Sequence, residues 1–198
     1  MVNITKIKDG YFLGDEATAA NLDVIFQFKI THMINSAGPQ ILNAWENIGT
    51  KYLTLNWNES PNQNLFDPKD EIANRIVAFI DDSYKNGDGF LVHSVKGQNR
   101  ACIVVLIYFI KKFRWSLKKT IEFLKSKKHD IDIPSYFLNQ LSSFEVRLTK
   151  AGIGPKSTSW NDVGTGLMSD IGQDKVKRWV HERSINNRHY MQNVSLNT

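Results

Sequence analysis

The 198-residue chain contains a single cysteine, Cys102, and this scarcity excludes a fold that depends on disulfide bonds. Its five histidines are scattered and show no zinc-site spacing, so we expect neither a metal nor another cofactor. No apolar run approaches the ~20 residues that a membrane-spanning helix requires, and the longest covers residues 101–110. The first residues lack the basic stretch and apolar stretch of a secretory signal peptide. We therefore expect a cytoplasmic or nuclear protein that has no membrane segment and is not secreted.

Positive charge is concentrated in one segment of the chain, whose formal net charge is +5. Residues 111–128 contain eight lysines or arginines and one acid, Glu122, so this segment carries +7 and the remainder −2. Such a segment can attract nucleic acid, anionic lipid or phosphorylated protein. For most of these side chains, however, the pattern favours an ordinary solvated helix surface.

Short apolar strands alternate with amphipathic helices over the first 150 residues. Apolar runs followed by turn residues predict strands, and helical spacing of apolar residues predicts helices. Asp15, Asp67 and Ser116 are predicted to cap three of these helices. The strands are expected at 11–13, 31–35, 52–55 and 90–92, and the helices at 17–28, 72–80, 117–124 and 137–148.

Residues 100–113, RACIVVLIYFIKKF, are apolar on every side, and their length favours a buried helix over a strand. The alternation predicts an α/β fold with a central, mostly parallel sheet flanked by helices. In such sheets, ligands bind at the carboxyl ends of the strands. From residue 151 onward the chain is polar and interrupted by glycines, so we expect a domain over 1–150 and a polar, Gly-rich C-terminal tail over 151–198.

The segment HSVKGQNR, residues 93–100, lies between a predicted strand and the predicted buried helix. Successive backbone N–H groups and the helix dipole make this arrangement suitable for binding an anion. Gly97 permits a positive φ and a close approach of the main chain to a ligand. Arg100, in the first helical turn, can hold two oxygens of a phosphate. The segment therefore predicts a site for a tetrahedral anion such as a phosphate monoester.

Residues 93–100 also resemble the signature H-C-x-x-G-x-x-R of cysteine-dependent protein phosphatases, with Ser94 in place of the cysteine. The resemblance extends to residues 11–37 and 115–145, which look like the opening strand–helix–strand and the two closing helices of dual-specificity phosphatases. It implies a dual-specificity phosphatase-like fold, in which a phosphate loop joins a strand to a buried helix. The tail is not covered by the resemblance.

The resemblance assigns a role to each matching position. In the family, a cysteine thiolate attacks phosphorus, an arginine holds the phosphoryl oxygens, and an aspartate on a preceding loop protonates the leaving oxygen. Ser94 occupies the position of the nucleophile and Arg100 that of the arginine. His93 corresponds to the histidine that supports the loop. The phosphate-binding residues implied in this way are Ser94, Val95, Lys96, Gly97, Gln98, Asn99 and Arg100.

Three departures from the family pattern concern the reaction itself. The Ser94 hydroxyl does not ionise as a thiol does, and it needs a general base to attack. Ala101 stands where the family usually has a Ser or Thr that helps the thiolate leave. The loop over 56–64, NWNESPNQN, has no aspartate, and Glu59 is its closest substitute as a possible general acid. The sequence thus predicts a pseudophosphatase that holds phosphotyrosine, phosphoserine or phosphothreonine of a protein ligand without hydrolysing it.

Other functions stay open at this point. One is an active dual-specificity protein phosphatase whose nucleophilic cysteine was replaced by Ser94. Another is binding of RNA 5′-phosphates, which the +7 segment suggests; since no interleaved aromatic residues are present to stack bases, nucleic acid is not the expected partner. A structural scaffold with an empty pocket is a further alternative. Nothing in the sequence fixes an oligomeric state.

Several other residues have two interpretations. Cys102 is a displaced nucleophile or, as its position beyond Arg100 favours, a small buried residue. Trp57 lines the rim of the pocket or packs against the domain. Lys96 and Gln98 contact residues that flank a phosphoresidue or are simply solvated. Core positions are expected for the aromatic residues Trp115, Phe137 and Phe144.

Overall fold

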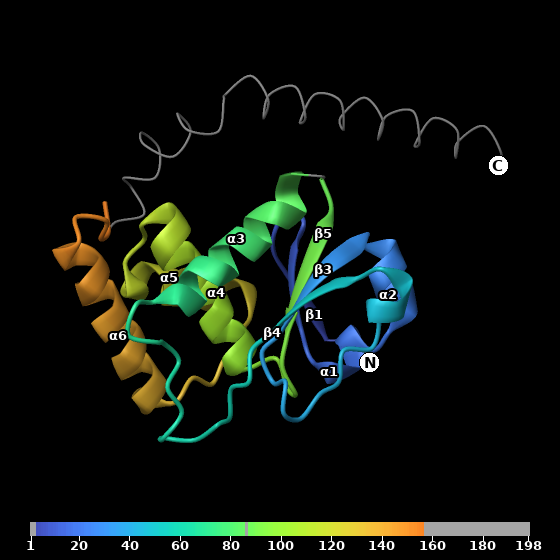
Figure 1. Cartoon of the computed structure of the whole chain (residues 1–198), viewed down its shortest axis with the longest axis horizontal. Helices are drawn as coiled ribbons and strands as arrows, with labels where there is room; N and C mark the ends of the chain where they lie inside the picture. The colour runs from blue at the N-terminus through green and yellow to red at the C-terminus, as the bar shows by residue number, and fades with distance from the viewer. Residues whose placement is uncertain (1–2, 86, 157–198) are drawn as a thin grey trace. The chain divides into compact units, whose positions relative to one another are not determined.

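The computed structural model describes residues 3–85 and 87–156 (Figure 1). Within these ranges, five strands form one sheet in the order β1-β2-β5-β3-β4. β1 runs antiparallel to β2, and the other three pairings are parallel, as predicted. The strands are β1 (Ile4–Lys8), β2 (Tyr11–Gly14), β3 (Ile30–Asn35), β4 (Lys51–Thr54) and β5 (Gly89–His93).

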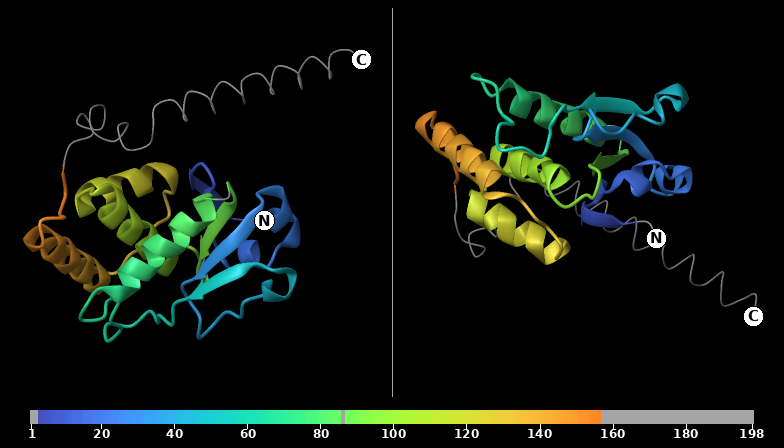
Figure 2. Two further views of the ribbon diagram at one scale, coloured as in Figure 1. Left: turned by 45° about the horizontal axis from the view of Figure 1, so that its top comes forward. Right: turned by 90° about the horizontal axis from the view of Figure 1, so that it is seen from below.

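Helices cover both faces of the sheet (Figures 1 and 2). On one face, α1 (Glu16–Ala19) contacts β2 and β5, and α2 (Leu22–Gln27) contacts β3. On the other face, α3 (Glu71–Lys85) and α4 (Arg100–Phe113) contact the sheet, while α5 (Leu117–Lys127) and α6 (Ser135–Lys150) pack on α4. A 3₁₀ helix, η1 (Glu46–Ile48), lies in the connection between β3 and β4.

The predicted buried helix is α4, in which every side chain from Ala101 to Ile110 is buried. It contacts β5, β2 and the three neighbouring helices α3, α5 and α6. The predicted core aromatics Trp115, Phe137 and Phe144 are buried as well. Because α4 follows β5 directly in the chain, residues 94–99 lie at the carboxyl edge of the parallel sheet, where ligands are expected.

Side chains at the helix starts make the predicted capping bonds. Asp15 Oδ1 accepts a hydrogen bond from the N–H of Thr18 at 2.8 Å, and Ser116 Oγ accepts one from the N–H of Lys119 at 3.2 Å. The Asp67 carboxylate accepts bonds from N–H groups at the start of α3, and these bonds lower its pKa. Local sequence signals therefore fix where these helices begin.

Two elements differ from the prediction. The expected single helix over 17–28 is divided into α1 and α2, because the Asn21 side chain accepts a hydrogen bond from the N–H of Val24 at 3.2 Å and starts a second helix. Strand β1 was not predicted, since Ile7 is its only buried side chain. A polar strand is typical of a sheet edge, which is where β1 lies.

The +7 segment does not present one continuous basic face. Lys119 and Lys128 are buried, and Lys112 forms an ion pair with Asp81 at 2.6 Å. The Arg114 side chain donates hydrogen bonds to two main-chain carbonyl oxygens just beyond α6. These contacts reduce the basic surface on which the RNA alternative depended.

The predicted tail lies outside the described residues except for 151–156, so the division into domain and tail at residue 150 stays a prediction. Residue Arg114 holds this first part of the tail segment through the bonds just described. None of the helices in the described ranges is long and apolar enough to cross a membrane.

Candidate phosphate-binding site

The loop of residues 94–99 packs against the connection between β2 and α1. The N–H of Glu16 donates a hydrogen bond to the Val95 carbonyl oxygen at 3.2 Å. Gly97 has φ of 68°, as the sequence predicted, and a Cβ placed on it would lie 2.7 Å from the Gly14 carbonyl oxygen. Gly97 is therefore required both for the left-handed conformation and for close packing of two backbone segments.

Replacing Gly97 by alanine is expected to lower the free energy of unfolding by about 3 kcal/mol, the combined effect of left-handed strain and a backbone clash. Gly87 is a matched control, because its φ is 71° but a Cβ there would meet no atom within 4 Å. Gly87→Ala should therefore cost only the left-handed strain of ~1 kcal/mol. Urea unfolding of both variants measures the difference, and equal losses would contradict the close packing at Gly97.

Most backbone N–H groups of this loop have no acceptor in the described part of the chain. Among residues 95–100 the exception is Gly97, whose N–H donates to Ser94 Oγ at 3.1 Å. Free N–H groups at a helix N-terminus carry partial positive charge, and burying them without an acceptor costs free energy. The loop thus offers a row of donors that an anion can accept. The N–H groups without a partner among the described residues are those of Val95, Lys96, Gln98, Asn99 and Arg100.

Ser94 is buried at the start of the loop. Within residues 3–85 and 87–156, the Gly97 N–H is the one group hydrogen-bonded to its Oγ. A serine nucleophile needs a base within hydrogen-bond reach to take its proton. Among the described residues, no basic side chain is hydrogen-bonded to Ser94 Oγ.

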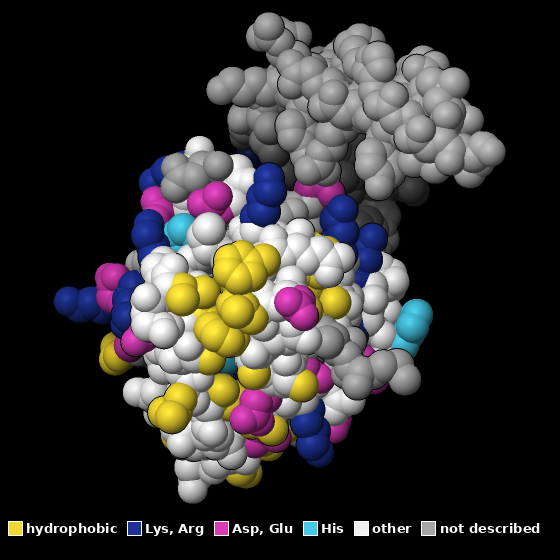
Figure 3. Space-filling view, turned by 90° about the vertical axis from the view of Figure 1, so that its right-hand side faces the viewer, with side chains coloured by type: hydrophobic (Ala, Val, Ile, Leu, Met, Phe, Trp, Pro, Cys, Tyr) yellow, Lys and Arg dark blue, Asp and Glu magenta, His cyan; other side chains and the backbone are white. Residues whose placement is uncertain are grey.

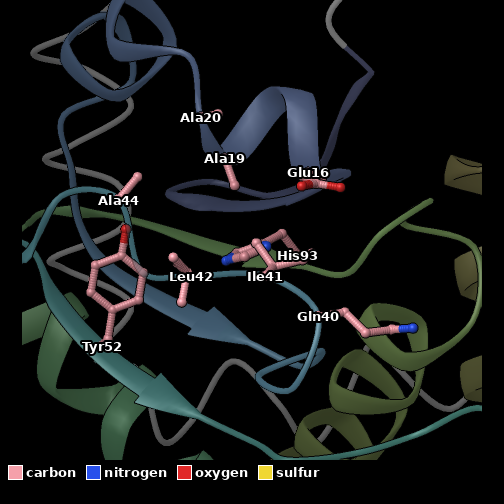
Figure 4. A pocket seen from close by; sticks show the side chains of 9 residues that line it. All are labelled: Glu16, Ala19, Ala20, Gln40, Ile41, Leu42, Ala44, Tyr52 and His93. Atoms are coloured by element: carbon pink, nitrogen blue, oxygen red, sulfur yellow. The ribbon is translucent and has the colours of Figure 1, made fainter.

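The His93 ring points toward Leu42 in Figure 4. It is 1% exposed, neither of its nitrogens has a hydrogen-bond partner among the described residues, and burial lowers its pKa to about 4. The His93 carbonyl oxygen, in contrast, accepts bonds from both the N–H and the Oγ of Ser36. The main chain of His93 is therefore held firmly, while support of the loop by its ring stays a prediction.

Arg100 is 2% exposed, and all of its guanidinium nitrogens face oxygens of the protein. Nε and Nη2 lie 3.2 Å from Glu59 Oε1, and Nη1 donates to Gln40 Oε1 at 2.7 Å and to the Trp57 carbonyl oxygen at 2.9 Å. A phosphate takes paired hydrogen bonds from two adjacent nitrogens of an arginine. In this conformation no such pair stands open.

Glu59 was predicted from the sequence as a possible general acid, and the structure brings it to Arg100. Its side chain is 49% exposed, so the ion pair joins a buried cation to a carboxylate at the surface. A salt bridge uses the ionised carboxylate, whereas a general acid has to carry a proton. The general-acid role therefore stays a prediction. The Trp57 ring, in turn, is buried and packs in the domain.

The outer side of the loop is held by the segment between α5 and α6. Gln98 Nε2 donates to Asp130 Oδ2 at 2.9 Å, and the Gln98 carbonyl oxygen accepts from the N–H of Asp132 at 2.9 Å. Asp130 also pairs with the buried Lys128 at 2.8 Å. Gln98 is thus engaged within the protein, and Lys96 is the exposed side chain of the loop.

Cys102 is fully buried in the first turn of α4, and its Sγ lies 3.5 Å from the Gly97 carbonyl oxygen. Burial raises the pKa of this thiol to about 12. Such a thiol is almost entirely protonated at neutral pH and is a poor nucleophile. These properties favour the packing role over that of a displaced nucleophile.

Solved structures of phosphatase-like domains share this fold. The human tyrosine phosphatase-like serine/threonine/tyrosine-interacting protein has a TM-score of 0.65 at 24% identity, covering 74% of this chain and 97% of that one. A leucine rich repeat and phosphatase domain containing protein from Entamoeba histolytica has a TM-score of 0.63 at 26% identity, with coverages of 75% and 94%. The fold is that of a phosphatase domain, as the resemblance implied.

Sequence comparison identifies the family. The sequence model of the dual specificity phosphatase catalytic domain matches residues 11–147. A probable rhodanese domain-containing dual specificity protein phosphatase of Dictyostelium discoideum is 30% identical over 143 residues, which are 72% of this chain and 29% of that protein. Human dual specificity protein phosphatase 6 is 30% identical over 138 residues, with shares of 69% and 35%. The chain belongs to the dual specificity phosphatase family and spans about a third of the length of these relatives.

Proposed function

We propose that this domain binds phosphorylated tyrosine, serine or threonine side chains of proteins and does not hydrolyse them. The observation that carries the proposal is the row of unpaired loop N–H groups at the start of α4, together with the buried Arg100. Such a row suits a tetrahedral dianion, since each phosphoryl oxygen can accept several hydrogen bonds. Because the chain belongs to the dual specificity phosphatase family, we infer that its ligand is a phosphate ester on a protein side chain.

The absence of hydrolysis follows from the chemistry of Ser94. Attack on phosphorus requires an oxygen or sulfur that has lost its proton, and a serine hydroxyl in this loop keeps it without a base. Among the described residues, neither nitrogen of the His93 ring is hydrogen-bonded to Ser94, and Ala101 has no hydroxyl to assist a leaving group. A bound phosphate ester therefore stays intact.

Glu59 has to move when the phosphate binds. It occupies the Nε–Nη2 edge of Arg100, which is one of the two edges that can form paired bonds with phosphate oxygens. Among the partners of Arg100, the Glu59 side chain is the half-exposed and negatively charged one. We therefore assign Glu59 the role of an internal competitor of the phosphate, in place of a general acid.

Replacing Glu59 by glutamine is expected to strengthen binding of inorganic phosphate about fivefold, because an ion pair of ~1 kcal/mol no longer has to be broken. Isothermal titration calorimetry at fixed salt measures this change. Glu46→Gln is the matched control, since Glu46 is an exposed carboxylate hydrogen-bonded to Asn43 and has no contact with Arg100. Weaker binding by Glu59→Gln would instead make Glu59 a residue that positions Arg100.

The function itself is tested with a tyrosine-phosphorylated peptide and its unphosphorylated counterpart. Calorimetry should detect saturable binding of the phosphorylated peptide alone. Mass spectrometry of the same mixture after prolonged incubation should recover the peptide with its phosphate in place. Free phosphate released in proportion to the amount of protein would contradict the absence of hydrolysis, and equal binding of both peptides would contradict recognition of the phosphate.

A further inference from the structure

The loop that carries Trp57 and Glu59 is anchored to helix α6 by one side chain. Gln140 Oε1 accepts a hydrogen bond from the N–H of Leu65 at 2.8 Å, and Gln140 Nε2 donates to the Gln63 carbonyl oxygen at 2.8 Å. These main-chain groups belong to residues 75 and 77 positions away from Gln140 in the chain. An amide offers both a donor and an acceptor, and here both hold the same loop to the helix.

The residues around Glu59 form a closed turn. Gln63 Oε1 accepts a hydrogen bond from the N–H of Asn58 at 2.9 Å, and the N–H of Gln63 donates to the Ser60 carbonyl oxygen at 3.0 Å. Glu59 therefore lies within a turn whose two ends are tied together. The bond from Gln140 to the Gln63 carbonyl oxygen holds this turn at its base.

The turn presents the Glu59 side chain to Arg100. The Trp57 ring before it is buried, and Leu65 after it is buried as well. Between these two fixed points Glu59 is half-exposed, and its Oε1 lies 3.2 Å from Nε and from Nη2 of Arg100. The position of the Glu59 carboxylate thus depends on a turn that is held by Trp57 on one side and by Gln140 on the other.

We propose that Gln140 is a positioning residue of the phosphate site, which holds the turn where Glu59 reaches Arg100 and thereby opposes phosphate binding. This inference rests on the proposed function, in which Glu59 has to leave Arg100 before phosphate binds. A ligand that binds only the open state loses affinity in proportion to the population of the closed state. A side chain that favours the closed Glu59–Arg100 pair therefore weakens phosphate binding without a contact of its own to the phosphate.

Replacing Gln140 by alanine in the full chain should strengthen binding of inorganic phosphate about twofold. Loss of the anchor lengthens the free part of the loop, and loop-closure entropy then lowers the population of the closed pair by about that factor. The gain should not exceed the roughly fivefold gain expected for Glu59→Gln, because Gln140 acts through Glu59. Isothermal titration calorimetry at fixed salt measures both variants.

Two further variants control for the substitution itself. Asn139 precedes Gln140 on α6, and its exposed side chain has no hydrogen-bond partner among the described residues, so Asn139→Ala should leave phosphate affinity unchanged. Gln140→Met keeps the length of the side chain but neither hydrogen bond. It should give the same gain as Gln140→Ala, and it keeps the test possible if the alanine variant does not fold.

A third control lies at the other end of the domain. Helices α2 and α6 are at opposite ends (Figures 1 and 2), and Figure 3 shows the α2 side, where apolar side chains gather at the surface. Phe26 of α2 is 67% exposed. Because this residue is remote from the loop, Phe26→Ser should leave phosphate affinity unchanged.

The decisive comparison places Gln140→Ala in the Glu59→Gln background. There it should give no further gain, since the carboxylate that Gln140 positions is gone. An equal change of affinity in both backgrounds would show a merely structural role and would overturn the proposal. Unchanged affinity in both Gln140 variants, with a gain in Glu59→Gln, would overturn the role of Gln140 and leave the proposed function intact. No binding of phosphate by any of these proteins would overturn both.

Discussion

Replacing Arg100 by alanine is expected to weaken binding of a phosphotyrosine peptide about a hundredfold. Two charge-assisted hydrogen bonds to phosphoryl oxygens are lost, each worth ~1.5–3 kcal/mol. Even at the low end of that range, the loss corresponds to about two factors of ten in affinity. Calorimetric titration of the natural sequence and the variant, at one salt concentration, measures the effect.

Because Arg100 is buried and bonds to Gln40 and Trp57, its loss can also affect folding. Arg100→Lys controls for this, since it keeps the charge but not the planar fork, and it should lose affinity less steeply. Lys96→Ala removes the exposed cation of the loop and should change affinity less than threefold. If the Arg100→Ala protein folds and binds the peptide as tightly as the natural sequence does, the Arg100 guanidinium does not contribute to phosphate binding.

Replacing Ser94 by cysteine is expected to produce hydrolysis of an aryl phosphate at least ~10³ times faster than that of the natural sequence. A thiol at this position faces unpaired N–H groups at a helix N-terminus, which stabilise a thiolate. Release of p-nitrophenol from p-nitrophenyl phosphate measures the rate. A natural sequence that already turns over as fast as Ser94→Cys would contradict the pseudophosphatase assignment.

The same variant also tests Glu59 in a second way. If Glu59 competes with phosphate, then Glu59→Gln in the Ser94→Cys background lowers KM and leaves kcat nearly unchanged. A large fall in kcat would instead identify Glu59 as the general acid that the sequence suggested. Cys102 does not interfere with this measurement, because its buried thiol has a pKa raised to about 12.

The elements that could be predicted from the sequence are those whose signal is local. The buried helix α4 follows from a run that is apolar on every side, and the helix starts follow from Asp15, Asp67 and Ser116. Strand β1 was missed because an edge strand needs few apolar residues. The break between α1 and α2 was missed because apolar spacing continues across Asn21, which nevertheless forms a cap.

In the candidate site, too, the features with a local sequence signal could be predicted and those without one could not. The loop residues 93–100 are contiguous, so their motif could be recognised, including the need for glycine at Gly97. The hydrogen bond from Arg100 to Gln40 joins residues 60 positions apart, and that from Gln98 to Asp130 joins residues 32 apart. Contacts between segments this distant depend on tertiary packing. The sequence around Gln40 and around Asp130 has no local pattern that would predict these contacts.

The most direct test of a phosphate-binding loop without a nucleophile is a crystal structure of the full chain with a phosphotyrosine peptide. An intact phosphate should lie in the loop, hydrogen-bonded to the N–H groups of residues 95–100 and to two nitrogens of Arg100, with the Glu59 carboxylate displaced. If Arg100 stays paired with Glu59 and the loop holds no phosphate at saturating peptide, the account is wrong.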